Sequence, residues 1–407
     1  MNVYATNVEW KDGIAIVPID PGLSASDSIS DNRQVPLREL ALFFLRLGTT
    51  AFGGPAAHIA IMEDELVRRR RWLSRERFLD LLGASNLIPG PSSSEVAIHI
   101  GYLCSGWRGL LIAGSCFIFP AAAMVAALGW LYVRFGKLPA TAGLLYGIKP
   151  VVIAVIVQAL WGLGRTAVKT TFLGFVAVSC IVLSVLGFHP LLLLLLAGVV
   201  TCLPELRISR PSLSVFAPLA VGSGSVAASA AFSLGSLFLV FLKLGAIVFG
   251  SGYVLLAFLR ADLVTHRGWL TDAQLADAVA VGQITPGPVF TTATFIGFIL
   301  GGSRGALLAT VGVFLPAFLL VAASGPLVPR IRKSRAAGAF LDGVNVASLG
   351  LMAAVSWQLG RVSLVDFPAV LLAAASLIAL LRFRLNSVWL VLFGAAIGAI
   401  SGLPHLR

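Results

Sequence analysis

The sequence predicts an all-α polytopic membrane protein built as a tandem repeat, and three observations lead to that prediction. Of the 407 residues, 58% are hydrophobic and only 12% are charged, whereas about 25% of the residues of a soluble domain are charged. Apolar runs suited to a hydrocarbon core roughly 30 Å thick recur along most of the chain. The second half of the chain also repeats motifs of the first half in the same order.

The apolar runs mark the expected membrane segments, and we expect them to be helical because a backbone in lipid must satisfy its own hydrogen bonds. The runs cover residues 110–135, 147–164, 172–186, 191–203, 237–259, 306–328 and 387–402. A large soluble core is the alternative, and it would need far more surface charge.

The net charge of +12 is concentrated in loops between the apolar runs, notably in residues 68–77 and 330–335. This distribution is typical of the positive-inside bias of membrane proteins and argues against a nucleic-acid partner. The first cluster, "RRRRWLSRER", also carries apolar side chains. We interpret it as a surface helix lying on anionic lipid, with direct steering of a substrate as the alternative.

The repeat becomes visible when the sequence is shifted by 197 residues, and 16 of the 48 positions from 44 to 91 are then identical. The shift becomes 196 after the motif Pro-Gly-Pro. We therefore divide the chain into a flexible tail (1–38), a first membrane repeat (39–204), a linker (205–235) and a second membrane repeat (236–404). Each repeat is expected to hold about five or six helical segments.

Loop charges indicate how the two repeats are oriented. The loop at 68–77 holds six Lys or Arg residues against two in its equivalent, whereas a later loop holds two against four at 330–335. Because the richer copy changes from step to step, an inverted repeat is favoured over a parallel one, which fits the total counts almost as well. Inversion requires an odd number of crossings in each half.

Both halves break an apolar segment with Pro-Gly-Pro, in "NLIPGPSSSE" (86–95) and in "QITPGPVFTT" (283–292). Proline ends a helix, and Pro, Ser or Thr suits the start of the next one. A broken or re-entrant helix is therefore expected in each half. Bending of the helices for packing alone is the alternative interpretation.

A helix amino terminus offers unpaired N–H groups and partial positive charge, which suit a tetrahedral oxyanion. Two such ends would meet near the bilayer midplane if the repeats are inverted. The predicted substrate-binding residues are Pro89, Gly90, Pro91, Ser92, Ser93 and Ser94 in the first half, and Pro286, Gly287, Pro288, Thr291 and Thr292 in the second.

Charged residues within apolar runs add further candidates, since burying a charge in a membrane is costly. Arg46 and Lys243 occupy equivalent positions, and as an inward pair they would neutralise a dianion. Snorkelling to the interface is the alternative for both. Lys149 and Asp342 are candidates for ion coupling.

Glu95 either caps its helix, as in a capping box, or carries a coupled proton. His58 could also titrate in this region, as could His99, but a lone histidine on an apolar face is more often a packed one. "FGG" (52–54) and "FGSG" (249–252) either let the first helix of each half unwind or allow close helix packing.

Nothing in the sequence points to an enzyme. There is no His-Glu-x-x-His motif, no cysteine pair with metal-ligand spacing and no phosphate-binding loop. The four cysteines are scattered in apolar runs and are interpreted as buried side chains. We therefore expect no cofactor and no metal ion.

Several long motifs resemble the chromate ion transporter (CHR) family. They are "FGGPAAHIAIMEDELV", "LIPGPSSSEVAIHIGY" and "WRGLLIAGSCFIFPA" in the first half, with "FLKLGAIVFGSGY", "WLTDAQLADAVAVGQITPGPVFTTATFIGF" and "RGALLATVGVFLPAF" in the second. The chain resembles a long-chain, two-domain member. The resemblance implies export of chromate across the bacterial inner membrane, resistance to chromate, competition by sulfate, and halves of opposite orientation.

The leading hypothesis is thus a secondary carrier that exports chromate by alternating access. Uptake or exchange of sulfate or a related oxyanion is a second hypothesis, and an anion channel is a third. The lipid bilayer and protons are further expected partners, and the sequence is compatible with a homodimer.

Overall fold

The computed structural model describes residues 9–11, 14–16, 35–86, 88–136, 138–208, 232–249, 252–324, 335–383 and 385–401. The described chain is helical apart from two short antiparallel strands, β1 (Glu9–Lys11) and β2 (Ile14–Ile16). The prediction of an all-α polytopic membrane protein is therefore confirmed. The rest of the predicted tail up to residue 34 and residues 209–231 of the predicted linker lie outside the described residues.

The described part of the first half is a succession of helices. They are α1 (Leu37–Thr50), α2 (Gly54–Met62), the π-helix η1 (Glu63–Arg69), α3 (Arg75–Ser85), α4 (Ser92–Phe135), α5 (Pro139–Ala167), α6 (Thr171–Val185) and α7 (Pro190–Ile208).

The second half repeats this series after the undescribed linker. It comprises α8 (Leu234–Ile247), η2 (Gly252–Val254), α9 (Leu255–Leu259), the π-helix η3 (Arg260–His266), α10 (Asp272–Ile284), η4 (Val289–Thr291), α11 (Thr292–Ser324), α13 (Arg335–Ser363), α14 (Phe367–Phe383) and α15 (Ser387–Ser401). The sequence repeat thus survives as a structural repeat, down to a π-helical turn at the same place in each half.

Four helical stretches in the described part are long and apolar enough to cross a membrane, namely 92–135, 142–167, 289–324 and 336–363. Shorter apolar helices occupy 171–185, 190–203, 234–247, 367–383 and 387–400. The run at 237–259 was predicted as one segment, which is wrong. Helix α8 ends at Ile247, before the glycine-rich "FGSG", and the next described helical turn begins at Gly252.

Helices α4 and α11 are hairpins. Ser105 and Gly106 leave the helical conformation in α4, as Gly301 and Gly302 do in α11. The carbonyl of Gly109 lies close enough to Gly101 that the two arms must run side by side. The two arms of α11 also run side by side, because the hydroxyls of Thr294 and Thr310 are hydrogen-bonded at 2.7 Å. Each Pro-Gly-Pro turn is therefore followed by a short arm that folds back along a long arm.

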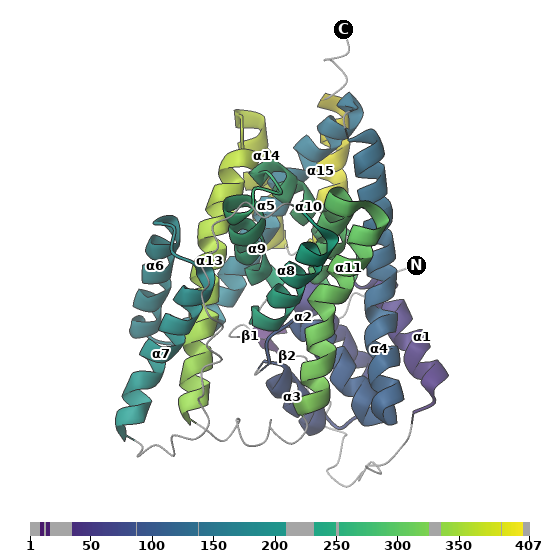
Figure 1. Ribbon diagram of the computed structural model, residues 1–407, viewed down its shortest axis with the longest axis vertical. Coiled ribbons are helices and arrows are strands. Elements are labelled where there is room, and N and C mark those ends of the chain that lie inside the picture. Colours follow the sequence, from purple (N-terminus) through teal and green to yellow (C-terminus); the bar gives the residue numbers. More distant parts are fainter. Residues whose placement is uncertain are drawn as a thin grey trace.

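The first helix of each half packs on the long arm of its own hairpin. Gly48 of α1 meets the carbonyl of Phe117, and Gly245 of α8 meets the carbonyl of Val313, so that the backbones touch directly. Small residues permit such close approach of helices in a membrane. Figure 1 shows α1 beside α4 and α8 beside α11.

The two long arms run antiparallel to each other. Gly114 of α4 packs against Phe318, in the later part of the long arm of α11, whereas Gly129, further along α4, packs against Phe298 of the short arm, whose neighbour Gly297 lies against Gly305 at the start of the long arm. The residue numbers therefore rise along one arm as they fall along the other. In Figure 1 these two helices lie next to each other along the long axis of the molecule.

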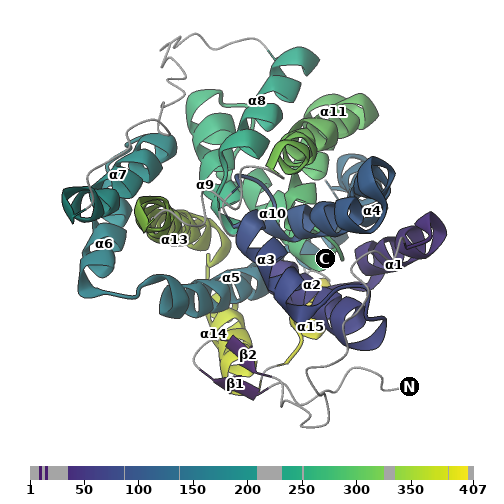
Figure 2. The same ribbon diagram turned by 90° about the horizontal axis from the view of Figure 1, so that it is seen from below.

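The last helices of each half pack on the other half. Helix α5 contacts α14 and α15, and α13 contacts α6 and α7. Gly147 of α5 meets the backbone of Gly394, and Gly343 of α13 meets the carbonyl of Ala197. Figure 2 shows α13 grouped with α6 and α7, and α5 grouped with α14 and α15. The halves are thus interwoven, and the interrupted segments α3, α9 and α10 lie near the middle of the molecule.

We expect Gly101→Ala to destabilise the protein, because the new methyl group would lie 2.3 Å from the Gly109 carbonyl oxygen. Overpacking of this kind costs about 1–3 kcal/mol. Gly162→Ala is the matched control, since nothing lies within 4 Å of a methyl group there. Unfolding of the detergent-solubilised protein measures both. Equal stability of the two variants would contradict the hairpin.

Candidate functional site

The two Pro-Gly-Pro turns are held by reciprocal backbone hydrogen bonds between the halves. The N–H of Gly90 donates to the carbonyl of Val248 at 2.7 Å, and the N–H of Gly287 donates to the carbonyl of Ala51 at 2.9 Å. These two carbonyls belong to the residues that end α8 and α1. Because neither helix continues, no N–H group of the same helix is available to bond them. Each turn therefore completes the broken first helix of the other half.

Both turns need glycine at their centre. Gly90 has a φ of +142° and Gly287 a φ of +91°, which L side chains rarely adopt. A methyl group on Gly287 would lie 2.6 Å from the Cβ of Ala121, on the long arm of α4. The turn of the second half therefore fits against the hairpin of the first half without room for a side chain.

The amino end of α4 carries polar groups that have no partner. Helix α4 starts at Ser92 after Pro91, and no side chain caps it. The hydroxyl of Ser94 and both carboxyl oxygens of Glu95 are buried without a hydrogen-bond partner among the described residues. The capping-box interpretation of Glu95 is therefore wrong, because its carboxyl accepts no N–H.

At the equivalent helix end of the second half, the side-chain hydroxyls donate to backbone carbonyls of their own turn. The hydroxyl of Thr291 donates to the carbonyl of Pro288 at 2.7 Å, and that of Thr292 donates to the carbonyl of Val289 at 2.8 Å. Both threonines are fully buried. Their hydrogens are thus used within their own turn, and the free polar groups of the two turns belong to the first half.

Two buried histidines flank the first turn. The Nε2 atom of His58 lies 3.1 Å from the Ala51 carbonyl oxygen, the same oxygen that Gly287 binds, and Nδ1 lies 3.4 Å from the Ser93 hydroxyl. His99 contacts the carbonyl of Glu95 through Nδ1 and the hydroxyl of Ser324 on α11 through Nε2. Both side chains therefore have partners at the junction of the halves.

The structure gives the two predicted cations different surroundings. Arg46 lies on an exposed face of α1, and its carbonyl accepts hydrogen bonds from two threonine hydroxyls one turn on. The ammonium of Lys243 pairs with Asp262 of η3 at 2.9 Å. The two cations are not brought together as an inward pair in this conformation.

Lys149 belongs to a buried polar cluster that joins three helices. Its ammonium lies 2.8 Å from a carboxyl oxygen of Asp277 on α10, and the other oxygen accepts a hydrogen bond from the hydroxyl of Tyr132 at 2.9 Å. Sequence reasoning missed Tyr132 and Asp277 as partners. The one available signal was the alignment of Asp277 with Asp80 in the repeat, and Asp80 is exposed.

Asp342 lies at the surface rather than deep in an apolar segment. It pairs with Lys169 at 2.8 Å, and both side chains are more than one third exposed. The equivalent contact in the other half joins Tyr146 and Asp366, whose carboxylate accepts from the tyrosine hydroxyl at 2.7 Å. Each contact links one half to the other.

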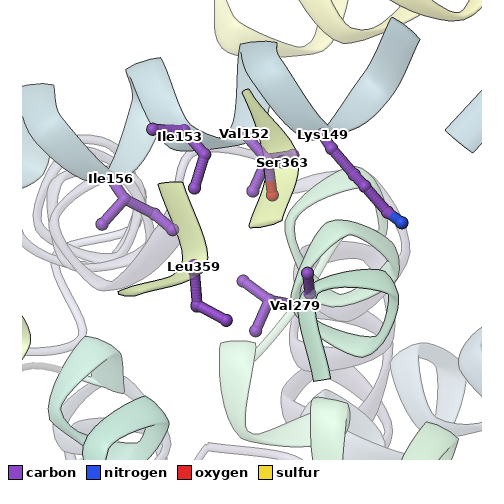
Figure 3. A pocket seen from close by; sticks show the side chains of 8 residues that line it. Lys149, Val152, Ile153, Ile156, Val279, Leu359 and Ser363 are labelled. Carbon is purple, nitrogen blue, oxygen red and sulfur yellow. The ribbon is translucent and has the colours of Figure 1, made fainter. Parts of the chain in front are cut away.

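A small cavity lies beside Lys149, and no residue of the Pro-Gly-Pro turns lines it. Its lining consists of Lys149, Val152, Ile153, Ile156, Ala276, Val279, Leu359 and Ser363. Figure 3 shows the Lys149 side chain directed away from the apolar lining. The lining is apolar apart from Lys149 and Ser363, and the Lys149 ammonium is already paired with Asp277. Within the described residues no group of His, Cys, Asp and Glu side chains is arranged to hold a metal ion.

Comparisons with known proteins agree on one family. The family described as "Chromate transporter" matches residues 38–202 and again residues 235–399. A chromate transport protein of Cupriavidus metallidurans is 35% identical over 401 residues, covering 96% of this chain and 99% of that protein. A chromate transport protein of Pseudomonas aeruginosa is 31% identical over 396 residues, with 92% and 95% covered.

A third relative, a probable chromate transport protein of Synechococcus elongatus, is 34% identical over 350 residues, which cover 84% of this chain and 89% of that protein. No solved structure matches the chain.

We expect Lys149→Ala to destabilise the protein by about 3–5 kcal/mol, because it leaves Asp277 as an uncompensated buried charge. The side chains of this pair are only 19% and 8% exposed. Lys169→Ala is the matched control, because it breaks an ion pair that is 59% and 37% exposed and should cost less than about 1 kcal/mol. Denaturant titration in mixed micelles compares them. The cluster has no structural role if both variants behave alike.

Proposed function

This chain belongs to the chromate transporter family, and we propose that it is a secondary carrier that exports chromate from the bacterial cytoplasm across the inner membrane. Its cellular role would then be resistance to chromate. The Pro-Gly-Pro turns and the helix ends that follow them form the proposed oxyanion site.

One observation carries the proposal, namely the reciprocal hydrogen bonds from Gly90 to Val248 and from Gly287 to Ala51. Irregular backbone at membrane depth is tolerated where it is buried in protein or lines a cavity. Here two such segments meet at the junction of two halves, which is where secondary transporters commonly bind their substrate. The family membership supports an oxyanion as that substrate.

The first-half end is the better equipped of the two. Ser92 is partly exposed, and the hydroxyl of Ser94 has no partner among the described residues, so both are available as donors. Oxygens of a tetrahedral anion would accept from these hydroxyls and from the free N–H groups of the first helical turn. Arg46 and Lys243 are proposed as more distant cations that attract the anion.

The antiparallel long arms of α4 and α11 support an inverted repeat. Equivalent elements that run in opposite directions through one bilayer are related by an axis in the membrane plane. Alternating access would then follow from movement of one part against the other, with the Lys149–Asp277 pair among the contacts that change.

The membrane potential supports export as the direction. A potential that is negative inside the cell favours outward movement of an anion by about 2.3 kcal/mol per charge per 100 mV. For a dianion this free energy is roughly twice as large. Uptake or exchange of sulfate, a dianion of the same shape, is the second candidate, and an anion channel the third. Protons and a homodimer remain proposals on sequence grounds.

We expect purified protein in liposomes to move labelled chromate, and the flux to saturate and to grow with a potential that is negative on the chromate-loaded side. Sulfate should compete. Flux that never saturates would favour the channel, and equal movement of neutral solutes would contradict the proposed site.

We expect Ser94→Ala to weaken oxyanion affinity about tenfold or more, since a hydrogen bond to a charged group contributes about 1.5–3 kcal/mol. Thr292→Val is the matched change in the second half. It should have a smaller effect, because that hydroxyl donates to the Val289 carbonyl. Inhibition of flux by unlabelled chromate gives both affinities. An unchanged affinity in the serine variant would remove Ser94 from the site.

A further inference from the structure

We propose that Glu95 is a proton-binding site whose occupancy is linked to oxyanion binding at the first Pro-Gly-Pro turn. The inference rests on the proposed function, since it deepens the chemistry of the same site. It assigns one proton to each chain.

The position of the Glu95 carboxyl is the first step. The side chain is fully buried, and neither oxygen has a hydrogen-bond partner among the described residues. The carboxyl folds back onto the Pro-Gly-Pro turn, because one of its oxygens lies 2.5 Å from where a Cβ on Gly90 would stand. The group therefore lies against the backbone of the turn that we propose as the substrate site.

The charges around Glu95 are the second step. The charged groups on the helices packed against α4 are exposed or belong to polar contacts that do not involve Glu95. They are Arg38, Glu39 and Arg46 on α1, Arg75, Glu76, Arg77 and Asp80 on α3, Asp272 and Asp277 on α10, and Arg304 on α11, with Arg108 and Arg134 on α4 itself. None of them forms an ion pair with Glu95 in the described structure.

Two buried histidines flank the turn and the helix that carries Glu95. His58 on α2 lies within reach of the Ala51 carbonyl and the Ser93 hydroxyl, and His99 contacts the backbone carbonyl of Glu95 rather than its carboxyl. Neither supplies a counter-charge to the carboxyl oxygens. A buried carboxylate without a partner is strongly disfavoured, so the group holds a proton in this conformation.

Binding of the proton and binding of the oxyanion then strengthen each other. An ionised carboxylate at the turn would repel a dianion, whereas the neutral acid removes that repulsion and offers an O–H donor. The unpartnered Ser94 hydroxyl stands one residue away and adds a second donor. The second half has Thr291 and Thr292 in the matching place, so it contributes no such group.

The linkage predicts how affinity depends on pH. Where the free carboxyl is already neutral, affinity is constant. Above that range each binding event takes up one proton, and affinity falls about tenfold for each pH unit. Glu95→Gln mimics the neutral acid, so its affinity should stay high and lose this dependence.

The experiment measures binding of labelled sulfate to the purified full-length protein from mildly acidic to alkaline pH, with chromate measured where it is a dianion. Proton uptake on sulfate addition is followed with an indicator dye in weak buffer, and it needs no variant. In the alkaline range where affinity falls with pH, we expect uptake of one proton per chain in the natural protein and none in Glu95→Gln. His99→Gln, a titratable neighbour, is the matched control and should keep the pH slope.

The outcomes are distinguishable. If the natural protein binds neither anion, the proposed function fails, and this inference fails with it. If it binds an anion without taking up a proton at any pH up to the alkaline end of the series, or if Glu95→Gln keeps the same pH slope, the linkage is overturned while the oxyanion site stands. Glu95→Asp guards against misfolding of the glutamine variant, since it should restore the slope.

Discussion

The fold depends on one constraint, which is that every backbone polar group inside a bilayer needs a partner within the protein. Four helix ends in this chain would violate that constraint if the halves were apart, because α1 and α8 stop inside the apolar region and the Pro-Gly-Pro turns cannot continue a helix. The bonds Gly90–Val248 and Gly287–Ala51 satisfy two carbonyls with two N–H groups of the opposite half. Each half therefore supplies what the other one lacks, and the irregular backbone needed for a site becomes tolerable.

The duplicated frame carries polar side chains that are not duplicated at the two Pro-Gly-Pro turns. The backbone arrangement recurs closely, yet the side chains at the two helix ends differ in kind. The first end keeps the hydroxyl of Ser94 and the carboxyl of Glu95 without partners, while the threonines of the second end donate to their own turn. Within the residues that the structure describes, the Lys149–Asp277–Tyr132 cluster likewise occurs once. The repeat thus determines where the chain bends, and the side chains that differ between the halves determine which polar groups each bend presents.

Much of the frame could be predicted from the sequence because it leaves periodic traces. Apolar runs, the Pro-Gly-Pro pairs and the shift of 197 residues predicted helices, breaks and a tandem repeat. The hairpin turn at Ser105–Gly106 and the exchange of terminal helices could not be predicted, since both depend on contacts between residues far apart in sequence. The pairing of Lys149 with Asp277 could not be predicted for the same reason. Asp262, the partner of Lys243, lies on a π-helical turn, which leaves no periodic pattern in the sequence.

The exchanged terminal helices have a consequence for how the chain is made. Helices α6 and α7 leave the ribosome long before α13, the helix on which they pack, because α7 ends at Ile208 and α13 ends at Ser363. At typical synthesis rates the interval is on the order of ten to thirty seconds. During that time the apolar helices of the first half stand in lipid with one face uncovered. Biogenesis of this protein is therefore complete only after the last segment has entered the membrane, and a truncated chain would leave an orphaned surface for the quality-control machinery to recognise.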